Sequence, residues 1–109
     1  MSVALDPGAL NRRLTLEAPV EIADGAGGVT RSYAAVATLW AAVEPIAARH
    51  DVVAAAAGAT VTHRIVIRYA SDITTRHRLR DGAQLYRIVT LRETVRRRFL
   101  EIRAEQRDA

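Results

Sequence analysis

Histidine is the side chain of this sequence that could most readily serve catalysis or bind a metal. The three histidines are His50, His63 and His77. None is spaced from another histidine or a carboxylate as ligands on one helix face are, and the adjacent His50 and Asp51 are expected to point to different sides. His63 falls on the inward face of a predicted strand, where a hydrogen-bonded core histidine is the more common occurrence.

The serines do not have the surroundings of a nucleophile. Ser2, Ser32 and Ser71 lie in an N-terminal arm or near loops, and the sequence contains no Gly-x-Ser-x-Gly elbow. The glycine-rich segment 24–28 lacks the Lys-Ser/Thr ending of a phosphate-binding loop. The sequence therefore predicts a protein that is not an enzyme and that needs no cofactor and no metal.

Arginine is the remaining residue with binding chemistry, because all sixteen basic residues are arginine and the net charge is +4. Residues 1–60 hold four arginines and six acids, whereas residues 61–109 hold twelve arginines and six acids. A basic half is typical of a nucleic-acid-binding face. Abundant alanine and absent lysine are also what a GC-rich genome imposes on any protein, and this compositional bias is the favoured alternative to a nucleic-acid-binding face.

The densest basic cluster is Arg96 to Arg98, together with Arg92. A guanidinium offers a planar fork to a phosphate or to a carboxylate of a partner. A solvated, charged turn is the alternative. Aromatic residues make up only 5% of the chain, which disfavours a platform for stacking bases.

Length and composition describe one ordinary folded domain of 109 residues, with 50% hydrophobic and 26% charged residues. The absence of cysteine excludes disulfides and thiolate metal sites. Residues 1–10 lack the basic and apolar regions of a signal peptide, and no apolar run reaches the length of about 18 residues that a membrane span needs. No membrane association is expected.

Alternating hydrophobicity predicts a mainly β protein, a small antiparallel β-barrel or sandwich of six to seven strands with one α-helix. The alanine-rich stretch within 46–57 is the expected helix, closed by Gly58. Pro19 is expected to limit the continuation of the first strand in a paired position, which would end it near Ala18. Trp40 is expected in the core, and the alternative is an exposed tryptophan that anchors an interface. The expected strands are 12–18, 29–33, 36–44, 60–69, 76–80, 84–91 and 98–104.

Turn signals complete the organisation of the chain. Glycines within 24–28 predict a hairpin with a long, mobile loop, and Asp81-Gly82 predicts a tight turn. We expect a flexible arm over residues 1–10, a single barrel domain over 11–105 and a frayed tail over 106–109.

The ordered features from about Gly8 to Glu105 resemble a known family, the phage head–tail adaptor or head-closure proteins, also called stopper or head–tail joining proteins. The most specific piece is Leu39 to Ile46, followed by an alanine-rich segment. The order of these pieces, their spacing and the chain length all agree with that family. The other matching pieces are Gly8 to Leu16, the glycine loop 24–28, Tyr33, Thr62 to Tyr69, Arg78-Leu79, Gly82, Leu85 to Ile88 and Arg98 to Ile102.

The resemblance implies a homo-oligomeric ring of six- or twelve-fold symmetry at the head–tail junction of a virion or phage-like particle, assembled in the bacterial cytoplasm. Its implied partners are a portal or adaptor protein on the head side and a tail terminator or tail protein on the other. DNA would pass through the lumen without sequence-specific contacts. The resemblance leaves open whether the position is that of a stopper, an adaptor or a tail terminator. It also leaves open the ring symmetry, any monomeric state before assembly, which loop closes the channel, and whether the chain comes from a phage, a prophage or a gene transfer agent.

Two sets of residues are candidates for function, one for ring assembly and one for the alternative of nucleic-acid binding. A head-to-tail ring needs two different complementary faces, and mobile or charged segments are the candidates for them. The candidate assembly residues are Asp24, Gly25, Gly27, Gly28, Arg49, Arg96, Arg97 and Arg98. The alternative function is direct nucleic-acid binding by a small arginine-rich barrel, through Arg64, Arg68, Arg87 and Arg96 to Arg98.

Overall fold

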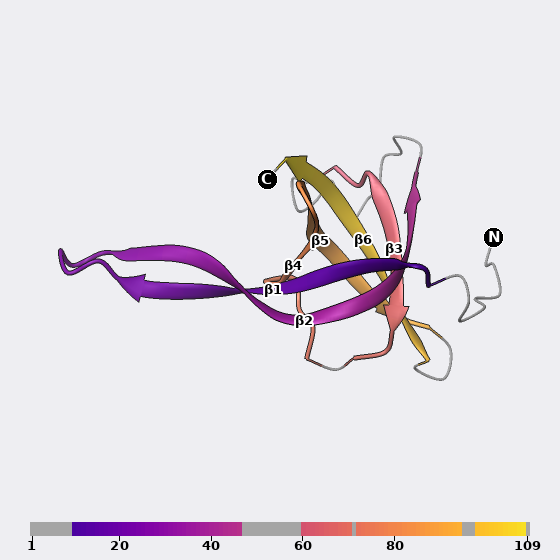
Figure 1. Ribbon diagram of the computed structural model, residues 1–109, viewed down its shortest axis with the longest axis horizontal. Coiled ribbons are helices and arrows are strands. Elements are labelled where there is room, and N and C mark those ends of the chain that lie inside the picture. Colours follow the sequence, from indigo (N-terminus) through magenta and orange to yellow (C-terminus); the bar gives the residue numbers. More distant parts are fainter. Residues whose placement is uncertain (1–9, 47–59, 71, 95–97, 109) are drawn as a thin grey trace.

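The strands expected from alternating hydrophobicity close into a six-stranded antiparallel barrel in the computed structural model (Figure 1). The structure describes residues 10–46, 60–70, 72–94 and 98–108. Neighbouring strands follow the order β1-β2-β3-β6-β5-β4, and β4 pairs with β1 to close the barrel. The strands are β1 (Arg12–Ala23), β2 (Val29–Pro45), β3 (His63–Arg68), β4 (Arg78–Asp81), β5 (Gln84–Glu93) and β6 (Phe99–Asp108).

The core consists of the side chains that point into the barrel. Because successive residues of a strand point to opposite sides, Leu14 and Leu16 of β1 and Ile65 and Ile67 of β3 face inward and are buried. The remaining buried members of this cluster are Ala41, Ile73, Leu79, Tyr86, Ile88, Leu100, Ile102 and Ala104. The mainly β class and the barrel are therefore confirmed.

His63 begins β3 in register with the buried Ala104 of β6. Its ring meets the Tyr86 ring edge-on, with 5.1 Å between centroids. Burial lowers the pKa of His63, and the positive charge of Arg12 acts in the same direction. The histidine is thus a packed aromatic residue of the barrel.

Two of the expected strands are one strand in the structure. Segments 29–33 and 36–44 both belong to β2, and its pairing with β1 shifts register between Leu16 and Glu17, where Val36 is the extra residue. Such a bulge reverses the alternation of the bulged strand. The interruption in the sequence pattern is therefore a bulge within a long strand and not a loop.

The first strand continues past Pro19, contrary to the expectation that the proline would end it. β1 pairs with β2 as far as Ala23, while its pairing with β4 stops at Glu17. Beyond that point one edge of β1 has no strand beside it among the described residues. A proline, which lacks the N–H of the ladder, is tolerated on such an edge.

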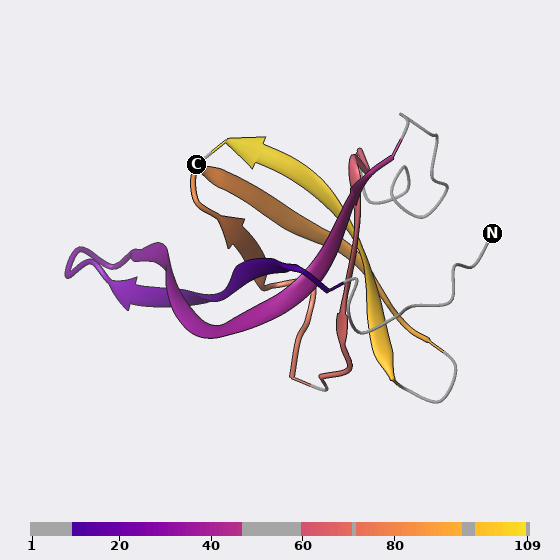
Figure 2. The same cartoon turned by 45° about the vertical axis from the view of Figure 1, so that its right-hand side comes forward.

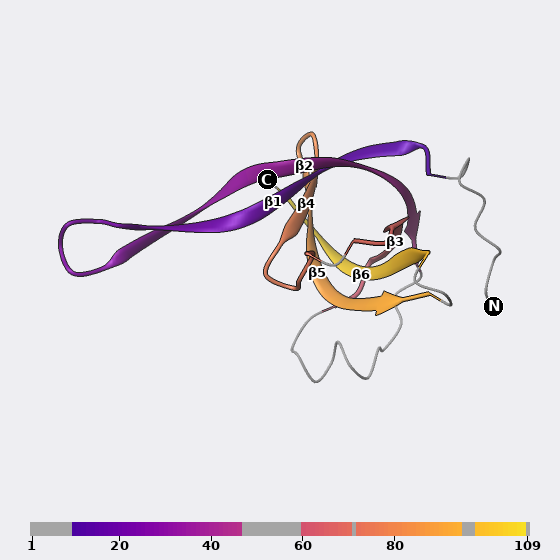
Figure 3. The ribbon, with the colours of Figure 1, turned by 90° about the horizontal axis from the view of Figure 1, so that it is seen from below.

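The hairpin formed by the outer parts of β1 and β2 projects from the barrel (Figures 1, 2 and 3). It makes the molecule elongated, with extents of 51 × 29 × 27 Å. Its tip lies apart from all other strands in the three views. We call this hairpin, residues 18–34, the arm, which is a different segment from the flexible N-terminal arm expected over residues 1–10.

The remaining expectations concern the turns and the chain ends. Gly82 has a φ of +59° in the two-residue turn between β4 and β5, as the Asp81-Gly82 signal predicts. β6 reaches Asp108, so residues 106–108, expected to be frayed, are paired with β5. Leu10, at the end of the expected N-terminal arm, is buried.

The expected α-helix is not confirmed. Ile46 is the only residue of the stretch 46–57 that the structure describes, so the helix and Gly58 lie outside the described residues. The described residues contain strands, turns and irregular segments only. No helix among them is long and apolar enough to cross a membrane.

Candidate functional site

The tip of the arm is a turn fixed by its own hydrogen bonds. Asp24 Oδ1 accepts the backbone N–H of Ala26 at 2.8 Å and that of Gly28 at 3.1 Å. These bonds, the one from Ala26 foremost, lower the pKa of the Asp24 carboxyl. Gly25 and Gly27 have φ values of +80° and +86°, which side chains with a Cβ rarely adopt. The tip therefore presents an ionised carboxylate on a narrow, glycine-rich turn.

One face of the arm carries no charge. Directly opposed residues of an antiparallel pair lie on the same face, and Ala18 is opposite Ala34, Val20 opposite Ser32 and Ile22 opposite Thr30. We call these six residues the uncharged face. In β1 this face continues the row of Leu14 and Leu16, which line the barrel core.

The opposite face of the arm is polar nearer the barrel. Glu21 and Arg31 are opposed and form an ion pair of 3.0 Å, and Pro19 is opposed to Tyr33. Near the tip Val29 lies opposite Ala23 and is 65% exposed. The two faces of the arm thus differ in chemistry.

The apolar side chains of the arm remain in contact with solvent. Ile22 is 56% exposed, and Val20 is also exposed. A two-stranded hairpin alone is marginally stable in water, because it buries little apolar surface. The arm therefore lacks the packing that holds the barrel together.

The arm meets the barrel at a buried carboxylate. Arg78 Nε donates to one oxygen of Glu17 at 2.6 Å, and Arg80 Nε donates to the other at 3.0 Å. Burial raises the pKa of Glu17, but the hydrogen bonds and charges of both arginines outweigh burial and hold it below its ordinary value. The Arg78 guanidinium also lies 3.7 Å from the centroid of the Tyr33 ring. One arginine of β4 thus contacts β1 and β2 at the base of the arm.

A groove of about 580 Å³ lies between the arm and the barrel wall. The arm forms one side, and the segment before β4 and the strands β4, β5 and β6 form the other. Among the described residues that line it, five are arginines and none carries a carboxylate. The groove is lined by Pro19, Arg31, Tyr33, Thr75, Arg76, His77, Arg78, Leu85, Arg87 and Arg107.

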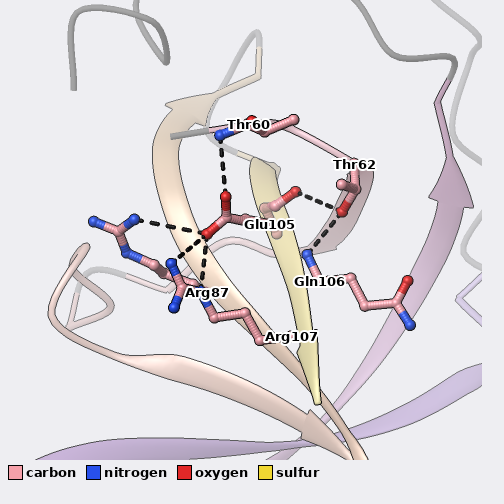
Figure 4. A network of polar contacts seen from close by, with 7 residues as sticks. Thr60, Thr62, Arg87, Glu105, Gln106 and Arg107 are labelled. Atoms are coloured by element: carbon pink, nitrogen blue, oxygen red, sulfur yellow. Dashed lines mark hydrogen bonds and ion pairs between the residues drawn. The ribbon is translucent and has the colours of Figure 1, made fainter. Parts of the chain in front are cut away.

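Glu105 contacts Arg87 and Arg107, two of the arginines that line this groove (Figure 4). Its Oε1 lies 2.7 Å from Arg107 Nη2 and 3.8 Å from Arg87 Nη1. Its Oε2 accepts the backbone N–H of Thr60 at 3.1 Å. The Thr60 bond foremost, and then Arg107, lower the pKa of Glu105. The carboxylate is therefore ionised and holds two arginines at the edge of the groove.

Trp40 lies on the outer wall of the barrel, so its expected place in the core is wrong. The side chain is 53% exposed, and its neighbour Ala41 is the residue of β2 that enters the core. The Arg13 guanidinium lies 5.2 Å from the centre of the Trp40 ring, within the range of a cation–π contact. An exposed tryptophan is a frequent anchor of protein interfaces.

The structure brings only part of the predicted assembly set together. Asp24, Gly25, Gly27 and Gly28 form the tip of the arm. Arg98 is exposed and precedes β6, whereas the groove beside the arm adjoins Arg107 near the end of the same strand. Arg98 is therefore remote from the arm. Arg49, Arg96 and Arg97 lie outside the described residues.

The arginines of the nucleic-acid alternative are partly engaged by carboxylates. Arg64 lies 3.1 Å from Glu101 and 3.5 Å from Glu44, and Arg87 is held near Glu105 as described. Arg68 is exposed. Within the described part of the chain, no three histidine, aspartate or glutamate side chains form a group that could hold a metal.

Sequence reasoning missed the groove and the buried Glu17. Glu17 and Arg78 are separated by 61 positions in the chain, so no local pattern relates them. The arm itself did leave a signal. In β1 the apolar alternation continues through Ala18, Val20 and Ile22, which is further than a barrel strand of ordinary length requires.

Comparisons with known proteins agree with this architecture. A family model described as phage head completion protein matches residues 5–107. A chain of the virion of a native gene transfer agent particle is 32% identical, with a TM-score of 0.66, covering 91% of this chain and 96% of that one. A protein from Shigella flexneri 2a, solved in solution, is 26% identical, with a TM-score of 0.71, covering 94% and 96%. Comparison with curated proteins gave no match.

Proposed function

This chain is a member of the phage head completion protein family, and we propose that it is a subunit of the connector between head and tail of a phage-like particle. Within that connector it forms either the head-closure (stopper) ring or the adaptor ring. The similarity to a chain of a gene transfer agent virion supports a place in an assembled particle. The role is structural, and the protein catalyses no reaction.

One observation carries the proposal for how the subunit assembles. The apolar row that lines the barrel core through Leu14 and Leu16 continues along β1 into the uncharged face of the arm, where Val20 and Ile22 are exposed. A monomer gains nothing from exposing such side chains. Packing them against another subunit removes them from water.

The uncharged face of the arm packs on the neighbouring subunit of the ring. Burying one valine or isoleucine side chain contributes roughly 1.5–3 kcal/mol, and a ring repeats that contact at every interface. The contact joins two different surfaces, as a head-to-tail ring requires. Portal or adaptor subunits bind the head side of the ring and tail subunits the other side, and DNA passes through the lumen without sequence-specific contacts.

The test replaces one side chain of the uncharged face with a charge. Ile22→Asp should leave the barrel folded but reduce incorporation of the protein into particles by about tenfold or more, because the interface then buries an unpaired charge. Tagged protein is supplied to a producer lacking the gene, and particles are purified and blotted. Electron microscopy then scores tailless and empty heads.

The matched control is Glu21→Gln, which alters the opposite face of the same arm. It should be incorporated at the level of the unsubstituted protein. Full incorporation of Ile22→Asp would contradict the role of the arm in assembly. Absence of the unsubstituted protein from particles, together with DNA binding that weakens steeply with salt, would instead support the nucleic-acid alternative.

A further inference from the structure

The barrel wall beside the arm holds two like charges in direct opposition. Arg78 of β4 is opposite Arg87 of β5, and like charges opposed on one face of a sheet repel each other. On the other side of β4, Glu17 of β1 is opposite Arg78, and on the other side of β5, Glu105 of β6 is opposite Arg87. A carboxylate thus flanks each arginine on the side away from the other arginine, and no carboxylate of the described part of the chain lines the groove between them.

The flanking carboxylates orient the guanidiniums and leave donors free. Glu17 contacts Arg78 through Nε, and a guanidinium has five N–H donors in all, so further donors remain for an incoming anion. Arg76 lines the same groove and has no carboxylate partner among the described residues. The Thr74 N–H donates to His77 Nδ1 at 3.1 Å, so Nδ1 is the acceptor of this ring and Nε2 is the nitrogen that can donate to a ligand.

The size and walls of the groove indicate the kind of anion. Its volume of about 580 Å³ is that of an ordinary ligand pocket, about 300–1,000 Å³, which holds a few side chains and not a nucleic-acid duplex. Tyr33 is the aromatic residue that lines the groove, and Arg78 lies over its ring. A stacked base would need that ring face. An extended polypeptide with carboxylates needs only the guanidinium forks.

We infer that this groove is a docking site for an acidic, extended segment of a partner protein. A carboxylate of that segment lies between Arg78 and Arg87, where it relieves the repulsion of the opposed guanidiniums, and a second one reaches Arg76. Pro19 and Leu85 contact the apolar parts of the segment. The site uses the polar side of the arm and stands independently of the uncharged face.

The experiment measures binding of a short fluorescein-labelled peptide of alternating glutamate and serine to the full chain by fluorescence anisotropy. The groove variant Arg76→Gln/Arg87→Gln should bind it about tenfold more weakly, because two charged hydrogen-bonding partners are lost. The control Arg68→Gln/Arg92→Gln removes the same charge from exposed positions outside the groove. Its affinity should stay within about twofold of the original.

A second variant protects the test against a folding defect. Arg76 lies outside the strands, in the segment before β4, so Arg76→Glu leaves the barrel pairing intact. It should weaken peptide binding by about tenfold, because one charged contact is lost and the new carboxylate repels the acidic peptide. Ile22→Asp leaves the groove unaltered and should bind the peptide normally, which separates this proposal from that of the arm.

Three results would overturn the docking site. Equal loss of affinity in the groove variant and in the control would mean that net charge alone attracts the peptide. Failure of the unsubstituted protein to bind the peptide saturably would remove the site. Tighter binding of duplex DNA through the same arginines would assign the groove to nucleic acid.

Discussion

The barrel and the arm are built from the same two strands and have opposite relations to water. In the barrel, β1 buries Leu14 and Leu16, which pack against a closed core. A few residues further along, the same alternation places Val20 and Ile22 in solvent. The difference arises because β1 pairs with both β2 and β4 from Thr15 to Glu17, and with β2 alone beyond Glu17.

This contrast separates stability from recognition within one hairpin. The barrel buries its core side chains without a partner, whereas the arm can bury Val20 and Ile22 only against another protein. Substitutions in the barrel should therefore change the free energy of unfolding, and substitutions in the arm should change assembly.

The same substitution made in both regions should have the largest difference in effect. Ile65 in the core is fully buried, whereas Ile22 is 56% exposed. Ile65→Ala should lower the free energy of unfolding by about 2–5 kcal/mol through lost packing and a cavity. Ile22→Ala should lower it by less than about 0.5 kcal/mol. Chemical denaturation followed by circular dichroism measures both.

The junction between the two regions should show the next largest effect. Glu17→Gln replaces an ionised acceptor of two arginine hydrogen bonds, and it should lower the free energy of unfolding by about 1.5–3 kcal/mol. Glu21→Gln breaks an exposed ion pair on the arm and should change it by less than about 1 kcal/mol. Equal effects of the two substitutions would show that the buried carboxylate is not what joins the arm to the barrel.

Mild acid should weaken the barrel through His63. Because burial lowers the pKa of His63 below its ordinary value of 6.5 in the folded protein, the unfolded chain takes up the proton first. The contribution of this group is complete above pH 6.5 and is lost as the pH falls through the lower, folded value. Melting temperatures measured down to pH 5 should fall for the original chain and fall less for His63→Asn. An identical slope for both would assign the effect to other groups.

The smallest expected effect is confined to the tip. Gly27 has a φ of +86°, and nothing lies within 4 Å of an added Cβ, so Gly27→Ala meets backbone strain of about 1 kcal/mol without a clash. Hydrogen exchange of tip amides should accelerate by about fivefold, with the melting temperature unchanged. A lower melting temperature would show that the arm is coupled to the barrel.

The sequence predicts the barrel well because its strands alternate clearly. Ile65 and Ile67 face the core as expected, and Gly82 occupies the expected turn. The alternation fails in β2, where alanines occupy positions on both faces and hardly distinguish inside from outside. The pattern therefore predicts Trp40 in the core, although it is Ala41 that is buried.

The candidate site could be predicted only in part, for a different reason. The glycine tip is a local signal and was found, although its role in assembly stays a prediction. The groove depends on register across several strands, since Glu17, Arg78, Arg87 and Glu105 meet only when β1, β4, β5 and β6 pair. Such a row cannot be derived before the order of the strands is known.

The continuity of β1 and β2 also determines how the arm would bear load. The two strands run unbroken from the barrel wall to the tip, and the hydrogen bonds of an antiparallel pair lie perpendicular to the strands. Tension on one of these strands, directed along the arm, is therefore shared by many bonds in shear, whereas a force that spreads the two strands apart at the tip opens the bonds one after another. A subunit held by its arm would thus resist being drawn away along the arm axis far better than being peeled off from the tip.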